Sequence, residues 1–363
     1  MVRGFVRFRG LAAGGLLLWA LAGCALAQPV RTAPTRPAEA KPWATTRIGD
    51  SPCVSSTDLA ARLGLKAVWD KKEPQLTLTT AAGRVLLLER DRRDVYLDGV
   101  RIMLSEPVLF QRDQAWVALP DVTKTLVPLL RPVDWLPQLP PAAPKTIVLD
   151  PGHGGTDPGK QNARLKLDEK DMALDVALRV RKLLEARGHQ VIMTRSTDKR
   201  FSNNPAVDLP MRADVANKAG ADLFVSIHFN AVDPQIAQRV SGSETYVLTP
   251  QHMESTEPER DRSMLPVANP GNRHDPANVL LGYEMHRAVL GALKTSDRGF
   301  KRARFAVLRP LKCPGVLVEA AYLSNDTEAR RVGTPAYRQQ IAEAIADGIR
   351  GYGEALTALR QPR

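Results

Sequence analysis

From residue 145 to the C-terminus, short apolar runs alternate with longer segments of helical periodicity. Short apolar runs bounded by polar or turn residues are typical of buried strands, and apolar residues at every third or fourth position are typical of helices. We predict strands at residues 146–150, 190–194, 223–228, 244–248, 304–308 and 316–319, and helices at residues 170–187, 210–219, 277–294 and 336–359. This alternation favours an α/β fold with a mostly parallel sheet covered by helices.

A smaller, strand-rich pattern occupies residues 51–131 and predicts a β-rich α+β module. A short helix is expected at residues 58–64, with Asp58 as its N-cap and Gly64 as its stop. Strands are expected at residues 76–79, 84–88 and 95–102, the last interrupted by an Asp98-Gly99 turn.

This module also repeats weakly within itself. The spacing Val54-x-x-x-Asp58-Leu59 recurs as Val117-x-x-x-Asp121-Val122. The pattern resembles the N-terminal-like domain of copper amine oxidases, a β-rich module often attached to envelope enzymes. The module contains no histidine, so we expect no copper there. Its expected role is binding to the envelope or to a partner, and a plain spacer is the alternative.

Two segments without periodicity divide the chain. Residues 28–50 are rich in Pro, Ala, Arg and Thr and predict a disordered tether. Residues 132–144 are rich in proline and predict a semi-rigid, extended linker at a domain boundary. We therefore expect an export signal at 1–27, the tether at 28–50, the module at 51–131, the linker at 132–144 and a catalytic domain at 145–363.

The first residues have the features of an export signal. Three arginines precede the apolar run at 11–22, which is too short and wrongly flanked for a membrane span. The sequence Leu21-Ala22-Gly23-Cys24 is similar to a bacterial lipobox, which would leave Cys24 lipidated and the protein anchored. Cleavage after Ala27 would instead release a soluble protein. We expect localisation in the cell envelope, in the periplasm, with or without a lipid anchor.

Charge and cysteine content narrow the expected partners. The hydrophobic and charged contents of 44% and 25% are those of a soluble globular protein. Removing the three arginines of the signal takes the net charge from +12 to about +9, which suits an anionic cell envelope. Export and the lack of basic runs interleaved with aromatics argue against nucleic acid. Cys53 and Cys313 fall in different predicted domains, and we expect two free thiols, although export would permit a disulfide.

The richest candidate for chemistry is the loop that follows the first strand of the catalytic domain. Residues 147–159 pass from an apolar strand into a turn of proline and glycine centred on His153. Glycines there allow conformations and close approaches that other residues do not. Two further predicted strands end at His228 and Glu319, and Glu169 stands at the start of the next helix. In a parallel sheet these side chains meet at one edge, where ligands of such sheets bind.

Two imidazoles and a carboxylate, with one position open to water, make a hydrolytic zinc site. A further carboxylate must take a proton from the water and pass it to the leaving amine. Each residue also has a simpler explanation. His153 could face water in a turn, and His228 could be a satisfied core histidine. Glu169 could favour the helix dipole, and Glu319 could be a paired acid at a strand end. No HExxH motif is present.

Four ordered motifs then identify the family. Residues 148–159, Glu169-Lys170-Asp171, residues 217–230 and residues 316–325 strongly resemble the zinc-dependent N-acetylmuramoyl-L-alanine amidases of amidase type 3. The resemblance covers roughly Lys145 to the C-terminus. It implies zinc bound by His153, Glu169 and His228, with Glu319 as the catalytic carboxylate. The implied reaction is hydrolysis of the amide between N-acetylmuramic acid and L-alanine in peptidoglycan.

Two features depart from the family pattern. The interval from His153 to Glu169 is slightly long, and Asp168 and Asp171 flank Glu169 as competing ligands. Residues 250–278 form a long polar insertion that contains His252 and His274, and we expect it to be a substrate-groove or gating loop. An envelope activator protein is a further expected partner. The alternative functions are an inactive wall-binding protein on the same fold and a zinc peptidase acting on stem peptides.

Overall fold

The computed structural model describes residues 42–70, 72–111, 113–257 and 262–361. From Pro42 onward the chain forms one compact unit. The predicted export signal, including Cys24 and Ala27, lies outside the described residues. Within the described part, no helix is both long and apolar enough to cross a membrane. The end of the predicted tether is ordered, because strand β1 at Thr46–Ile48 pairs with β2.

The catalytic half is built on a mixed, mostly parallel sheet, as the alternating pattern predicts. Its strand order is β12-β9-β13-β16-β14-β15. All neighbours are parallel except β14, which runs antiparallel to β16. The strands are β9 (Thr146–Pro151), β12 (Gln190–Met193), β13 (Leu223–Asn230), β14 (Ser243–Leu248), β15 (Asp297–Ala303) and β16 (Gly315–Tyr322). A small hairpin, β10 (Gln161–Asn162) with β11 (Leu167–Asp168), stands apart from this sheet.

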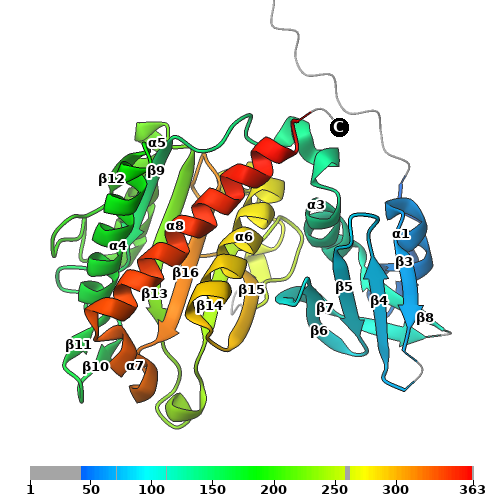
Figure 1. The fold of residues 1–363 in the computed structure, drawn as a ribbon, viewed down its shortest axis with the longest axis horizontal. Coiled ribbons are helices and arrows are strands. Elements are labelled where there is room, and N and C mark those ends of the chain that lie inside the picture. Colours follow the sequence, from blue (N-terminus) through cyan, green and yellow to red (C-terminus); the bar gives the residue numbers. More distant parts are fainter. Residues whose placement is uncertain (1–41, 71, 112, 258–261, 362–363) are drawn as a thin grey trace, which may run out of the picture. The chain divides into compact units, whose positions relative to one another are not determined.

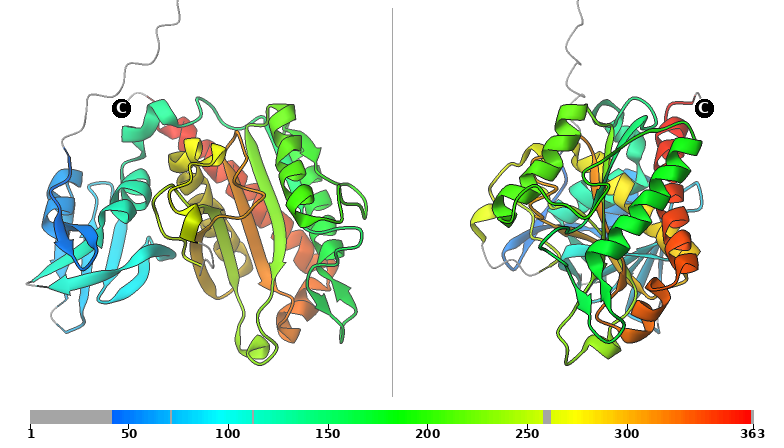
Figure 2. Two further views of the ribbon diagram at one scale, coloured as in Figure 1. Left: turned by 180° about the vertical axis from the view of Figure 1, so that it is seen from behind. Right: turned by 90° about the vertical axis from the view of Figure 1, so that its left-hand side faces the viewer.

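Helices cover both faces of this sheet. Its long helices are α4 (Glu169–Ala186), α5 (Pro205–Ala219), α6 (Asp275–Leu293) and α8 (Pro335–Ala358), and α7 (Asp326–Val332) is shorter. In Figure 1, α4, α6 and α8 lie across the front of the sheet, and Figure 2 shows α5 on the opposite side. Short 3-10 turns occur at Ala237–Arg239, Arg262–Met264 and Pro270–His274.

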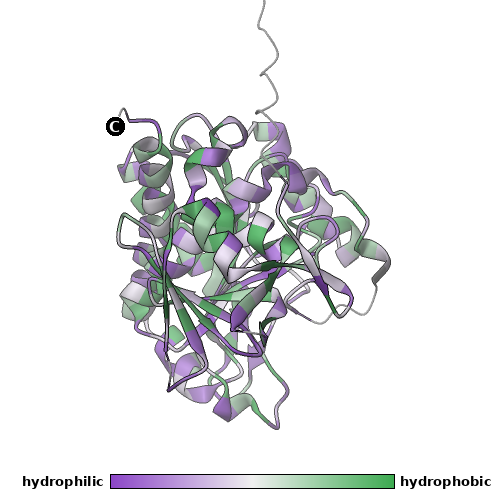
Figure 3. Ribbon diagram, turned by 90° about the vertical axis from the view of Figure 1, so that its right-hand side faces the viewer, coloured by the Kyte–Doolittle hydropathy of each residue, from purple (hydrophilic) through white to green (hydrophobic). Residues whose placement is uncertain are grey.

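Successive residues of the central strands point to opposite faces and fill two separate cores. Ile147 and Leu149 of β9 join the larger core under α4, α6 and α8. Val148, between them, joins the smaller core that contains α5 residues. The strands are therefore buried on both sides, which explains why they appear in the sequence as unbroken apolar runs. Figure 3, which looks at the molecule from the side of the module, shows hydrophobic and hydrophilic residues alternating along the helices and strands in view.

One predicted strand is wrong. Residues 304–308 form turns rather than a strand, with the Leu308 N–H donating to the Phe305 carbonyl at 2.9 Å. The strand is β15, immediately before them, although it carries Lys301 and Arg302. These long side chains are buried yet bonded: Lys301 pairs with Glu257 at 2.8 Å, and Arg302 donates to the Lys124 carbonyl at 2.7 Å. The ion pair of Lys301 and the hydrogen bonds of Arg302 offset the cost of burying these two charges in a strand.

Two predicted helix starts also shift. Helix α5 begins at Pro205 rather than Pro210, because Asn204 caps it by accepting a hydrogen bond from the Ala206 N–H at 3.0 Å. In the module, α1 (Ser56–Leu63) is capped by Ser55 rather than Asp58. The Asp58 N–H donates to Ser55 Oγ at 3.0 Å, so Asp58 lies inside the first turn.

The module is β-rich, as expected. Its strands are β1, β2 (Ser51–Ser55), β3 (Lys66–Trp69), β4 (Gln75–Thr79), β5 (Val85–Glu89), β6 (Arg92–Leu97), β7 (Val100–Gln111) and β8 (Gln114–Ala118). Besides α1 it has α2 (Leu119–Asp121) and α3 (Val127–Leu130), joined by a π-helical turn at Val122–Leu126. The Asp98-Gly99 turn joins β6 to β7 with positive φ at both residues, as that dipeptide predicts.

The internal repeat corresponds to two strand-to-helix units. Val54 on β2 and Val117 on β8 are register partners in an antiparallel pair, and each strand leads directly into a helix. The buried Asp121 carboxylate accepts hydrogen bonds from the Ser105 N–H and Oγ, both at 2.8 Å. Burial raises the pKa of Asp121 to about 6 despite these bonds.

Contacts join the module to the catalytic half within the same compact unit. Phe300 of β15 pairs with Ile102 of β7 in parallel. The Arg101 N–H donates to Asp297 Oδ2 at 2.8 Å.

The proline-rich segment is not extended, because Pro132–Gln138 forms a 3-10 helix. Within the part of the chain that the structure describes, Cys53 and Cys313 are both buried free thiols.

Candidate metal site and active centre

Strands β9, β13 and β16 carry the candidate residues to one region of the sheet. Strand β9 ends two residues before His153. Strands β13 and β16 instead continue past His228 and Glu319, as far as Asn230 and Tyr322, so neither residue stands at a strand end as expected. His228 and Glu319 are register partners in this parallel pair, which brings them side by side.

The loop after β9 is held in an unusual conformation. His153 has φ of 60°, a left-handed backbone conformation that residues other than glycine seldom adopt. Two buried arginines fix the backbone around it. Arg212 donates to the carbonyl of His153 at 2.7 Å, and Arg195 donates to that of Gly152 at 2.7 Å. The loop is therefore locked by buried hydrogen bonds to its carbonyls.

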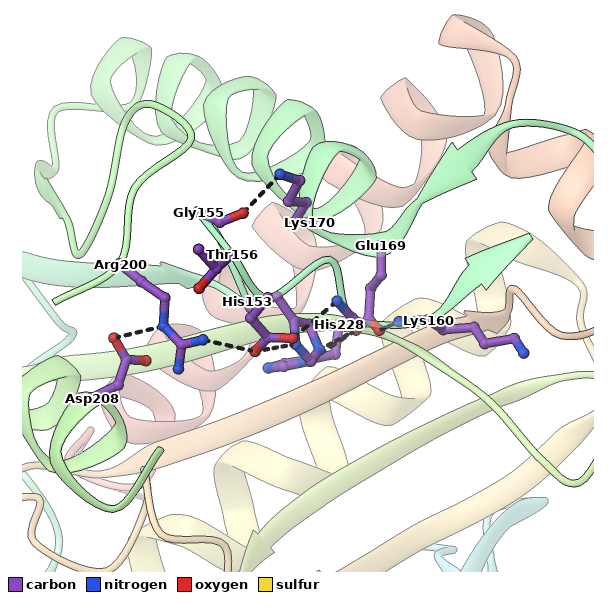
Figure 4. Close-up of polar contacts among 12 residues, drawn as sticks. His153, Gly155, Thr156, Lys160, Glu169, Lys170, Arg200, Asp208 and His228 are labelled. Carbon is purple, nitrogen blue, oxygen red and sulfur yellow. Dashed lines mark hydrogen bonds and ion pairs between the residues drawn. The ribbon is translucent and has the colours of Figure 1, made fainter. Parts of the chain in front are cut away.

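Glu169 brings the two histidines together. Its Oε1 lies 3.1 Å from His153 Nε2 and 2.9 Å from His228 Nδ1. The potential ligand atoms of these three residues all lie within 4.8 Å of one another. Figure 4 shows the three side chains converging from the β9 loop, the start of α4 and β13. The structure thus brings together the three residues that the sequence suggests as ligands.

The carboxylate of Glu169 is fixed in place by the backbone. Its Oε2 accepts the Lys160 N–H at 2.8 Å, and its Oε1 also accepts the Phe229 N–H at 3.0 Å. Burial favours the neutral acid, but the hydrogen bonds from both histidines outweigh it and hold the pKa of Glu169 below its usual value. Asp168 instead accepts a hydrogen bond from Gln161 at 2.9 Å, away from the cluster. Glu169 is therefore the carboxylate that faces the histidines.

The donor set fits a divalent metal ion. Zinc accepts two imidazole nitrogens and a carboxylate oxygen, and tetrahedral geometry separates such ligands by about 3.3 Å. The second nitrogen of His153, Nδ1, lies 3.0 Å from Asp157 Oδ2. Metal-binding histidines commonly donate their other ring N–H to a carboxylate in this way. Asp157 was not expected from the sequence, although it stands in the same glycine-rich loop.

Two glycines leave room for these side chains. A methyl group on Gly152 would overlap the ring of His228. A methyl group on Gly159 would come within 2.6 Å of both His153 Cδ2 and Glu169 Oε2. Gly159 also has φ of 65°. These positions need glycine because the ligands pack directly on the backbone.

Glu319 lies beside His228 but has a different environment from Glu169. Its Oε2 is shielded from solvent and has no hydrogen-bond partner among the described residues. Burial raises the pKa of Glu319 well above its usual value, and the nearby carboxylates of Glu169 and Glu244 add to the effect. The two acids beside His228 thus have pKa values shifted in opposite directions, which suits a division of roles between metal binding and proton transfer.

A buried polar network lies behind Glu319. Glu244 is its centre and accepts hydrogen bonds from the hydroxyls of Tyr246 and Tyr322, both at 2.5 Å. It also lies 3.1 Å from Lys301 Nζ. The positive charge of Lys301 opposes the rise in the pKa of Glu319. Sequence patterns gave no sign of this network, since its members come from three different strands.

The cluster opens into a cavity of about 350 Å³, whose lining includes His153, His228, Glu319 and the turn residues Phe305–Val307. Among the described residues of the 250–278 insertion, none lines this cavity. The insertion instead packs on β15, where the Thr256 N–H donates to the Arg302 carbonyl at 3.0 Å. His252 and His274 are not part of the metal cluster that the described residues form.

The part of the chain that contains the site is similar to a known protein family. The sequence profile of the N-acetylmuramoyl-L-alanine amidase family matches residues 147–351, the region that contains the four residues of the site. The chain belongs to this family. The germination-specific N-acetylmuramoyl-L-alanine amidase of Bacillus subtilis is 34% identical over 227 residues, which are 60% of this chain and 84% of that protein.

The share of each relative that the match covers varies. The AmiC amidase of Escherichia coli is 34% identical, and the match covers 58% of this chain but 53% of that protein. Among solved structures, the AmiC2 amidase of Nostoc punctiforme is 31% identical, with a TM-score of 0.46 over 59% of this chain and 97% of that one. The module at 51–131 lies outside the region that matches the family.

Proposed function

We propose that this amidase hydrolyses the amide between the lactyl group of N-acetylmuramic acid and L-alanine in peptidoglycan, with zinc held by His153, Glu169 and His228. The observation that carries the proposal is the convergence of two imidazole nitrogens on one oxygen of Glu169, at 2.9 and 3.1 Å. When bound there, zinc would polarise the scissile carbonyl and lower the pKa of a water molecule.

We assign the proton transfers to Glu319. It accepts a proton from the attacking water and donates it to the nitrogen of L-alanine as the carbon–nitrogen bond breaks. Water thus adds a hydroxyl group to the lactyl carbonyl and a hydrogen to the departing amine. The raised pKa of Glu319 favours the donating half of this cycle, and the positive charge of Lys301 opposes that rise.

The other parts of the chain receive accessory roles in this proposal. The N-terminal residues would act as an export signal that directs the enzyme to the periplasm, with a lipid anchor at Cys24 or cleavage after Ala27. The resemblance of residues 51–131 to the copper amine oxidase N-terminal-like domain supports a wall- or partner-binding role without copper. We further propose that residues 28–50 tether the enzyme and that residues 132–144 mark the boundary between the module and the catalytic domain. An envelope protein would act as the activator.

Digestion of purified cell wall tests the proposed reaction. Mass spectrometry of the products should show a new L-alanine amino terminus and an unsubstituted lactyl acid. A stem-peptide peptidase would leave that amide intact, and an inactive wall-binding protein would release nothing. Either of these results would replace the proposal, whereas loss of cleavage on chelation and its recovery with Zn²⁺ would support the metal assignment.

A further inference from the structure

Arg200 lies beside the active centre, and its guanidinium is not fully hydrogen-bonded to the neighbouring side chains. The side chain of Arg200 is 10% exposed, and its buried Nε has no hydrogen-bond partner among the residues that the structure describes. The nearest carboxylates are those of Asp208 at 3.8 Å and Asp157 at 4.0 Å, both beyond hydrogen-bond length. Figure 4 shows the guanidinium pointing between Asp208 and the His153 loop.

Both of these acids are already committed to other donors. Asp208 accepts hydrogen bonds from Arg212 Nε and from the Phe201 N–H, both at 2.8 Å. Asp157 lies 3.0 Å from His153 Nδ1 and accepts the Gly159 N–H at 3.1 Å. A buried guanidinium without a well-placed acceptor is costly, so Arg200 has the capacity to bind an incoming anion.

The two other arginines that line the neighbouring hollow, Arg195 and Arg212, each donate several hydrogen bonds within the protein. Arg212 donates to Asp208, Asp150 and two backbone carbonyls, and Arg195 donates to four backbone carbonyls. Arg200 therefore differs from Arg195 and Arg212, because its guanidinium lacks their well-placed acceptors. Its methylene stem is held against Gly155, where an added methyl group would lie 3.3 Å from Arg200 Cγ. The side chain is thus positioned in advance of binding.

Arg200 also borders two cavities. One is the cavity that contains His153, His228 and Glu319, and the other is a neighbouring hollow of about 330 Å³ lined by Arg195, Lys199 and Arg212 among others. A ligand group held by Arg200 would therefore be close to the scissile bond. The planar fork of arginine is suited to a carboxylate, which it can bind through two parallel hydrogen bonds.

Resting on the proposed function, we infer that Arg200 is a specificity-determining residue that binds the stem-peptide carboxylate nearest the scissile amide. The lactyl carboxyl is part of that amide, and L-alanine carries no free carboxylate. The first anionic group is the α-carboxylate of the γ-linked glutamyl residue that follows. Amidation of this group removes its charge, so Arg200 would make the enzyme distinguish acid from amide substrates.

Two soluble muropeptides test the inference, one with the free α-carboxylate and one with the α-amide at that residue. The wild-type enzyme should cleave the acid with a kcat/KM about 10- to 100-fold higher, mainly through KM, as expected for a charged hydrogen-bonded pair. Arg200→Met should remove most of this preference and leave cleavage of the amide within about threefold. Arg200→Lys should restore part of it, since the charge remains but the fork is lost.

Lys199→Met is the matched control, because Lys199 lines only the neighbouring hollow of the two cavities. It should keep the wild-type preference. Equal losses on both substrates in Arg200→Met, accompanied by a lower melting temperature, would make Arg200 a purely structural residue and overturn the inference. An equal rate on both substrates in the wild type would also overturn it. Failure of the wild type to cleave either muropeptide would reject the proposed function itself.

Discussion

His228 on β13 stands directly opposite Glu319 on the neighbouring parallel strand β16. This register places a candidate metal ligand and the candidate proton-transfer group side by side on rigid elements of the sheet. Strands fix their side chains better than loops do, so the spacing between the two functions depends on backbone hydrogen bonds rather than on side-chain flexibility. A substitution at Glu319 can therefore separate these two functions.

Glu319→Gln should retain zinc but lose cleavage of purified cell wall. The amide keeps the shape of the side chain yet cannot accept and return a proton, and loss of such a group reduces kcat by about 10²- to 10⁴-fold. Metal content and wall cleavage should be measured on the same preparation. A Glu319→Gln enzyme that cleaves wall as well as the parent would show that another group moves the proton.

Glu169→Gln and Asp168→Asn form a matched pair of neighbouring substitutions. We expect Glu169→Gln to weaken zinc binding by more than about tenfold, because its carboxylate lies against both histidines. Asp168→Asn should leave zinc binding unchanged, since Asp168 contacts Gln161 instead. Titration with zinc under competition from a chelator would measure both affinities. The reverse outcome would make Asp168 the third ligand.

Gly152→Ala should reduce zinc content and activity, because the added methyl group overlaps the ring of His228. Forcing extra volume into a packed site costs about 1–3 kcal/mol, and here the displaced group is a ligand. Gly291→Ala is the control: that helical position is open, so the change should stabilise the protein by up to about 1 kcal/mol. Thermal melting and metal analysis of both variants would distinguish the effects. Full zinc content in Gly152→Ala would contradict the packing argument.

The buried Asp121 should make stability fall as the pH rises. Its folded-state pKa of about 6 is above the usual value of 3.8 for an aspartate, so the folded protein binds the proton more tightly than the unfolded chain. The stabilisation is complete below about pH 4 and is lost as the pH rises through about 6, a change on the order of 3 kcal/mol. Asp121→Asn cannot ionise, so the difference in unfolding free energy between the two proteins should shrink or reverse over this range. Denaturant titrations at pH 4, 5, 6 and 7 would measure it, and a constant difference would refute the assignment.

The sequence predicts those helices and strands whose buried residues are apolar. Strands β9 and β13 and the β6–β7 turn follow directly from apolar runs and the Asp98-Gly99 dipeptide. Strand β15 does not follow from the sequence pattern because its buried residues include Lys301 and Arg302, whose partners lie on distant segments. The apolar run at 304–308 was mistaken for a strand because burial alone does not distinguish a packed turn from a strand.

The site was predictable in its members but not in its surroundings. His153, Glu169, His228 and Glu319 were expected from their positions after strands or at a helix start, together with the family motifs. The structure is needed to choose Glu169 over Asp168 as the ligand, because the choice depends on which carboxylate faces the histidines. The contacts of Asp157, Glu244 and Arg200 were invisible in the sequence, since each depends on side-chain packing between separate segments.

The close packing of Gly152 and Gly159 on the ligands has a genetic consequence. Any missense change at these codons adds atoms where a ligand already lies, so inactivating mutations should be found at positions that bind nothing. In a random library selected for loss of lysis, these two positions should be recovered about as often as the ligands themselves. The mutational target of the metal site is therefore larger than its set of ligands, and it includes backbone positions that have no side chain at all.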